Sequence, residues 1–120
     1  MKHEIKWLDE PEQHDYPAAR SYLTLHFNEE MATGLVDRLR TAAMSEFKAK
    51  DVIRASGLRQ LGEDNRHVAH NLEKITKGKP LSPILLVRHN ERLYVADGYH
   101  RTCAVYLLDE DAEIPAKIAG

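Results

Sequence analysis

The run Val-Ala-Asp-Gly-Tyr-His-Arg at residues 95–101 joins a strand-like segment directly to a helix-like segment. The strand pattern stops at Asp97 and Gly98, and the helix pattern starts at Tyr99. A helix N-terminus carries N–H groups without intrahelical partners and the positive end of the helix dipole. Gly98 lets the backbone approach a ligand closely, and Arg101 can add a charge-assisted contact. The run therefore predicts a strand–turn–helix unit with an anion site, for phosphate, at the turn.

Length and composition set the broad class of the chain. Its 120 residues are enough for one compact domain. The formal net charge of -2 gives no general attraction to nucleic acid, although a local basic patch stays open. No apolar run approaches the roughly 20 residues of a membrane helix, and the N-terminal residues lack the apolar core of a signal peptide. Cys103 is the single cysteine, so we expect no internal disulfide. These features together predict no membrane partner and a cytoplasmic location.

The first half of the chain predicts strands and one helix. Residues 5–7 fit a short edge strand, and the alternation of apolar residues over 21–27 indicates a half-buried strand. Asn28 then offers an N-cap for a helix whose apolar spacing extends to about Met44. Residues 47–53 fit a short strand and a turn, which we favour. In the alternative, Asp51 caps a short helical turn that extends through Ala55.

The second half predicts a helix, a hairpin, a second helix and a final strand. The first helix covers residues 64–77, with Asp64 as its N-cap candidate and Gly78 and Pro80 beyond its end. The later elements are strands at 84–87 and 93–96 joined by a turn at 89–91, a helix at 99–108 and a strand at 114–118.

This second half resembles the ParB/sulfiredoxin-like superfamily, which includes the ParB-like nuclease domains. The resemblance rests on Pro-Ile-Leu-Leu-Val at 83–87, Leu-Tyr-Val-Ala-Asp-Gly-Tyr-His-Arg at 93–101 and Ile-Pro-Ala-Lys-Ile at 114–118. It covers about residues 47–118 and leaves 1–46 as an N-terminal strand–helix extension of one domain, 1–120. It implies a small α+β fold with a mixed sheet and packed helices. It also implies a phosphate-binding turn that holds CTP in ParB proteins and ATP in sulfiredoxins and a free-serine kinase.

The same resemblance implies roles for the turn and also marks departures from the family pattern. The family's Gly-x-x-Arg element falls on Gly98 and Arg101, and the Asp-Gly-x-x-Arg pattern is closer to the kinase branch. Tyr99 stands where a sulfiredoxin has its reactive cysteine, and Cys103 lies one helical turn later on a face that we expect to be buried. We therefore expect no oxygen–sulfur chemistry. A full ParB protein also has DNA-binding and dimerisation domains, so we do not expect chromosome partitioning by this chain alone.

The candidate site residues carry several possible roles. Asp97 beside a phosphate needs a compensating charge from Arg101, protonated His100 or a divalent metal. It can otherwise act as a general base or merely cap the helix. His100 can donate to phosphate, transfer a proton or fix the turn. Glu63, before the 64–77 helix, is a further candidate base or metal ligand, although capping also explains it. The expected phosphate-binding residues are Gly98, Tyr99, His100, Arg101 and Thr102.

Three functions stay open at this point. The first is a binding domain for a nucleotide or phosphorylated small molecule, with ATP or CTP and Mg²⁺ as the expected cofactors. The second adds phosphoryl transfer or hydrolysis, with Asp97 or Glu63 as the base. The third is a non-enzymatic module that binds DNA or a protein partner through the basic residues of segment 48–59. In this hypothesis the module can act as a homodimer. His67 and His70 have metal-ligand spacing, but without an evident third ligand we expect solvated helix surface and no metal site.

Overall fold

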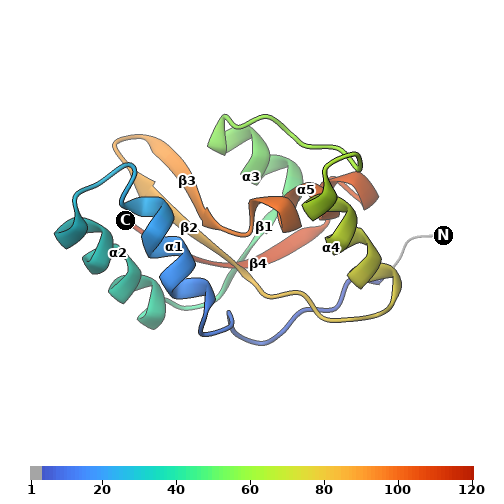
Figure 1. Ribbon diagram of the computed structural model, residues 1–120, viewed down its shortest axis with the longest axis horizontal. Helices are drawn as coiled ribbons and strands as arrows, with labels where there is room; N and C mark the ends of the chain where they lie inside the picture. Colours follow the sequence, from blue (N-terminus) through green and yellow to red (C-terminus); the bar gives the residue numbers. More distant parts are fainter. Residues whose placement is uncertain (1–3) are drawn as a thin grey trace.

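The computed structural model describes residues 4–120, which form five helices and one four-stranded sheet (Figure 1). The elements run α1 (Asp15–Leu23), α2 (Glu29–Thr41), β1 (Ser45–Lys48), α3 (Ala49–Ser56), α4 (Arg66–Thr76), β2 (Ile84–His89), β3 (Arg92–Asp97), α5 (Tyr99–Leu108) and β4 (Glu113–Ala119). The expected small α+β fold is therefore confirmed. None of the helices within residues 4–120 has both the length and the apolar character needed to cross a membrane.

The sheet is mixed and has the strand order β1-β4-β2-β3. β2 and β3 form the predicted antiparallel hairpin, whereas β4 runs parallel to β2 and antiparallel to β1. A register shift between Leu85 and Leu86 lies near the end of the hairpin at which β3 leads into α5. The order places β2 and β4 in the interior of the sheet, which explains the nearly continuous apolar run of β2.

Helices cover both faces of the sheet and create two apolar cores (Figure 1). On β2, Leu85 and Val87 pack with α1 and α2, while Ile84 and Leu86 pack with α3, α4 and α5. This division follows from the strand geometry, because successive side chains point to opposite faces. The hairpin is thus held between two helical layers, and α5 belongs to the layer that also contains α3 and α4.

The largest error of the sequence-based prediction lies in the N-terminal segment. Residues 21–27, predicted as a strand, form the end of α1 and a following turn. The buried apolar face of α1 consists of Tyr16, Ala19 and Leu23, which repeat at helical spacing and pack against the sheet. Leu25, by contrast, is 81% exposed, so the alternation that indicated a strand does not match the burial.

Smaller corrections concern the element ends. Trp7 forms an isolated parallel bridge with Leu81 instead of a strand. The favoured strand of 47–53 ends at Lys48, and the chain passes directly into α3. Asn65, not Asp64, caps α4 by accepting hydrogen bonds from the first-turn amides. The Asn28 cap of α2 is confirmed.

Candidate functional site

The predicted turn lies between β3 and α5, and its geometry requires glycine. Gly98 has a φ of 101°, in the left-handed region that side chains with a β-carbon rarely adopt. A β-carbon at this position would lie 2.5 Å from Ile84 Cγ2 and 2.8 Å from Arg101 Nη2. The backbone of the turn therefore packs directly against β2 on one side and against Arg101 on the other.

The N-terminus of α5 has no side-chain cap. Helices α2 and α4 begin with asparagine caps, but Gly98 has no side chain with which to accept. The first hydrogen bond of α5 runs from the amide of Thr102 to the carbonyl of Gly98, at 3.0 Å. Among residues 4–120, we find no acceptor for the amides of Tyr99, His100 and Arg101. Three backbone donors at the positive end of the helix dipole are thus available to a ligand.

Arg101 lies beneath the turn and neutralises Asp97. Its Nη2 donates to Asp97 Oδ2 at 3.0 Å and approaches the carbonyl of Pro83 at 3.5 Å. The two side chains are only 16% and 19% exposed. The Nε atom of Arg101 is buried and has no hydrogen-bond partner among the described residues. Arg101 therefore supplies the charge compensation expected for Asp97, whose carboxylate does not cap the helix.

Asp15 is a buried member of this site that the sequence did not reveal. It is the first residue of α1, is 3% exposed and accepts a hydrogen bond from the hydroxyl of Ser82. Its carboxyl group also neighbours Asp97: burial raises the pKa of Asp97, Arg101 opposes this rise, and Asp15 adds to it. We refer to Asp15, Ser82, Asp97 and Arg101 as the Asp97 cluster. It joins the starts of α1, β2 and α5, which are distant in sequence.

His100 is also packed at this helix start. Its ring lies 4.8 Å from the ring of His67 on α4, measured between centroids. Burial, then the neighbouring His67 and Arg101, lower the pKa of His100 below its usual value of 6.5. His100 is therefore mainly neutral at neutral pH and can donate a hydrogen bond but supplies no positive charge. Within residues 4–120, no group of three potential metal ligands forms around either imidazole.

The hydroxyls of Tyr99 and Thr102, two of the expected phosphate-binding residues, make hydrogen bonds within the protein. The hydroxyl of Tyr99 donates to the carbonyl of Arg59 at 2.5 Å, and burial raises its pKa. The buried hydroxyl of Thr102 donates back to the carbonyl of Gly98 at 3.0 Å. Both hydroxyls thus have partners inside the protein, which spacing along the chain alone does not show.

Glu63 is exposed to solvent, whereas Cys103 is buried. Glu63 is exposed in the turn before α4, and no hydrogen bond or ion pair within residues 4–120 joins it to Asp97 or Arg101. Cys103 is buried, accepts from the amide of Leu61 at 3.4 Å and has a pKa raised by burial. The expected burial of Cys103 is confirmed, and the role of Glu63 as a base stays a prediction.

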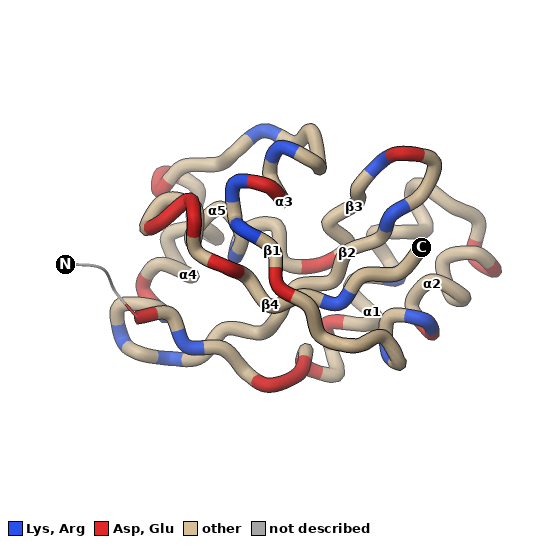
Figure 2. Tube along the Cα trace, turned by 180° about the vertical axis from the view of Figure 1, so that it is seen from behind, with Lys and Arg blue, Asp and Glu red and all other residues tan. Residues whose placement is uncertain are grey.

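The basic residues of segment 48–59 are partly neutralised by acidic neighbours. Lys50 Nζ lies 2.6 Å from Asp111 Oδ1, and Arg54 Nη2 lies 2.5 Å from Asp51 Oδ1. Figure 2 shows basic and acidic residues interspersed along this part of the chain. The segment therefore forms a weaker cationic surface than its lysines and arginines indicate in the sequence.

Comparisons with known proteins identify no relative of this chain. No family model matches the chain, and neither the curated proteins nor the solved structures include a significant match.

Proposed function

We propose that this protein binds the phosphate of a nucleotide or phosphorylated small molecule at the N-terminus of α5. One observation carries the proposal: the amides of Tyr99, His100 and Arg101 are uncapped where Gly98 brings the chain into the helix. A phosphate oxygen is a strong acceptor for such amides, and its negative charge is stabilised by the helix dipole.

Arg101 within the Asp97 cluster bears on the charge that an anion at the turn would meet. It pairs with Asp97 and so offsets the negative charge of that carboxylate. The buried Nε of Arg101 is a further donor without a partner among the described residues. Neutral His100 adds a hydrogen-bond donor at the same helix start. The uncapped amides, the Nε of Arg101 and the ring N–H of His100 favour an anion at the turn, whereas the carboxyl group of Asp15 opposes one.

The ParB/sulfiredoxin-like resemblance supports ATP or CTP as the ligand, because the resembling elements surround this turn. Mg²⁺ would be held largely by the nucleotide's own phosphate oxygens, since residues 4–120 contain no cluster of three suitable side chains. A nucleotide ligand also agrees with the expected cytoplasmic location.

The binding proposal is tested by following backbone amide resonances during titration with pyrophosphate, ATP and CTP, with and without Mg²⁺. We expect saturable shifts at residues 99–101. Arg101→Lys keeps the charge beside Asp97 but loses the planar, two-pronged donor, so it should weaken binding about tenfold. Arg38→Lys on α2 is the matched control and should bind like the wild type.

Two results would contradict the proposal. One is the absence of shifts at residues 99–101 with every ligand. The other is equal affinity of the wild type and Arg101→Lys. Shifts confined to segment 48–59 would instead favour the basic-surface hypothesis, which a mobility-shift assay with DNA at low salt then tests.

Phosphoryl transfer or hydrolysis at this site is a second candidate, favoured by the neighbouring carboxyl groups of buried Asp15 and half-buried Asp97. A carboxyl group with a raised pKa is a better general base than an exposed one. Asp97→Asn should therefore lower phosphate release from ATP or CTP about a hundredfold or more while nucleotide still binds. Glu63→Gln is the control and should leave release unchanged. Equal release by Asp97→Asn and the wild type would exclude this chemistry.

A further inference from the structure

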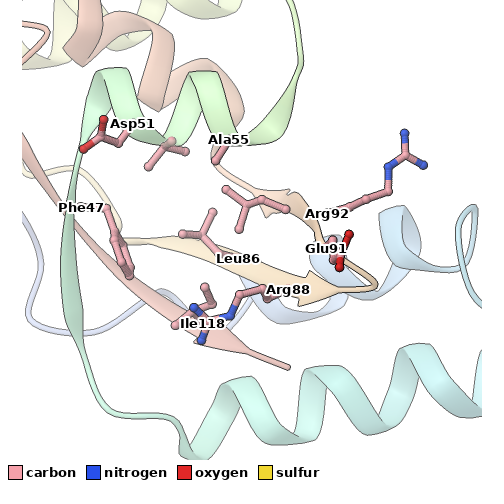
Figure 3. A pocket seen from close by; sticks show the side chains of 10 residues that line it. Phe47, Asp51, Ala55, Leu86, Arg88, Glu91, Arg92 and Ile118 are labelled. Carbon is pink, nitrogen blue, oxygen red and sulfur yellow. The ribbon is translucent and has the colours of Figure 1, made fainter.

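A hollow of about 440 Å³ opens on the α3 side of the sheet, between α3 and the β2–β3 hairpin (Figure 3). It shares no residue with the Asp97 cluster or with the turn at Gly98. Most of its lining is apolar and comes from β1, α3, the hairpin and β4. These apolar residues are Phe47, Val52, Ala55, Leu86, Leu93 and Ile118.

The hollow exists because the helices do not cover this end of the sheet completely. α4 and α5 pack together beside α3, while the hairpin extends beyond them (Figure 1). α3 presents the small side chain of Ala55 toward the hollow. Phe47, Leu93 and Ile118 are consequently only partly buried. Apolar surface left to water is unfavourable, and an apolar concavity of this size is typical of small-molecule sites.

The charges at the rim favour an anionic head group. The guanidinium of Arg88 lies beside Ile118, whereas Arg92 points away from the hollow (Figure 3). Among the described residues, neither arginine makes a hydrogen bond or ion pair through its guanidinium, and both are exposed. Asp51 on the α3 side is already paired with Arg54 at 2.5 Å. Glu91 in the hairpin turn would repel an anion, so the favourable position for a head group is beside Arg88.

We propose that this hollow binds a small amphipathic carboxylic acid. Its hydrocarbon chain covers the partly buried Phe47, Leu93 and Ile118, and its carboxylate pairs with Arg88. A guanidinium recognises a carboxylate through two parallel hydrogen bonds, which fixes the direction of the bound molecule. The proposal goes beyond phosphate binding at α5 and does not depend on it, because the two sites use different residues.

The test is a titration of the isotope-labelled protein with decanoate below its micelle concentration, followed through backbone amide resonances. We expect saturable shifts around residues 47, 55, 86 and 118 and none at residues 98–101. Decanol and acetate should each bind at least tenfold more weakly, because one lacks the charge and the other lacks the chain.

Variants of the chain separate charge from shape. Arg88→Gln should weaken decanoate binding about tenfold and leave decanol binding unchanged. Arg38→Gln, which removes an equal charge on α2, should change neither. Ala55→Leu places a larger side chain at the wall and should reduce the affinity for decanoate and decanol alike.

Several outcomes would overturn the proposal. These are the absence of saturable shifts around the hollow, decanol binding as tightly as decanoate, and unchanged decanoate affinity in Arg88→Gln or Ala55→Leu. Loss of phosphate binding at residues 99–101 would not bear on it, so the failures of the two proposals are distinguishable.

Discussion

Replacing Gly98 with alanine is expected to lower the free energy of unfolding by about 3 kcal/mol. The residue must keep a φ of 101°, which strains any side chain, and its β-carbon would overlap Ile84 and Arg101. Relief of that overlap would shift the turn away from β2 and displace the start of α5. Urea unfolding followed by circular dichroism measures the loss as a lower transition midpoint.

Gly34 provides the matched control for this substitution. It lies within α2, and a β-carbon there would meet no atom within 4 Å. Gly34→Ala should therefore stabilise the protein by about 0.5 to 1 kcal/mol, because alanine favours helix. A Gly98→Ala protein as stable as the wild type would show that the turn is not constrained as described.

Arg101→Met is expected to lower the free energy of unfolding at neutral pH by about 2 to 3 kcal/mol. The substitution keeps much of the side-chain volume but removes the cation beside Asp97. The half-buried carboxylate of Asp97 then faces Asp15 without its ion-pair partner. Removal of one partner from such a pair costs more than the pair contributes, because a charge is left uncompensated.

The pH dependence identifies the electrostatic origin of this loss. Burial and Asp15 already raise the pKa of Asp97 above the ordinary value of 3.8, and loss of Arg101 would raise it further. Since the folded protein then holds the proton more tightly than the unfolded chain, Asp97 destabilises the fold as pH rises through its folded pKa. The deficit of Arg101→Met should therefore shrink as pH falls toward 3.8.

A double substitution completes this test. Arg101→Met with Asp97→Asn removes both charges and should recover part of the lost stability at neutral pH. A deficit that is independent of pH and unchanged by Asp97→Asn would assign the role of Arg101 to packing alone. Urea unfolding at pH 4 and pH 7 separates the two explanations.

Gly98 and Arg101 contribute both to the stability of the fold and to the proposed phosphate site. Gly98 holds α5 against β2, and Arg101 both neutralises Asp97 and lies beside the uncapped amides. Arg101→Lys, used to test phosphate binding, keeps the charge and should retain more of the stability than Arg101→Met. Comparison of the two variants therefore distinguishes loss of a ligand from loss of the fold.

Elements governed by neighbouring residues could be predicted from the sequence. The hairpin, α5 and the cap of α2 at Asn28 follow from turn residues, side-chain periodicity and capping. Residues 21–27 were mispredicted because their apolar alternation fits a strand locally. Packing of Tyr16, Ala19 and Leu23 on the sheet decides for a helix, and packing is a long-range property.

The candidate site divides in the same way. Gly98 and Arg101 were predictable because the turn, the helix start and the basic residue are adjacent in the chain. Asp15 and Ser82 were not, since only the docking of α1 against the hairpin brings them to Asp97. The sequence likewise does not show that the hydroxyl of Thr102 donates to the carbonyl of Gly98 in the folded protein.

The sequence by itself determined the strand–turn–helix unit at residues 95–101, because local backbone preferences and an adjacent arginine suffice for it. Only the tertiary structure decided which side chains face that turn, that Asp97 is paired with Arg101 beside Asp15, and where the sheet stays uncovered at the hollow. These properties depend on burial and on charges brought together by folding, which have no signature in the order of residues along the chain.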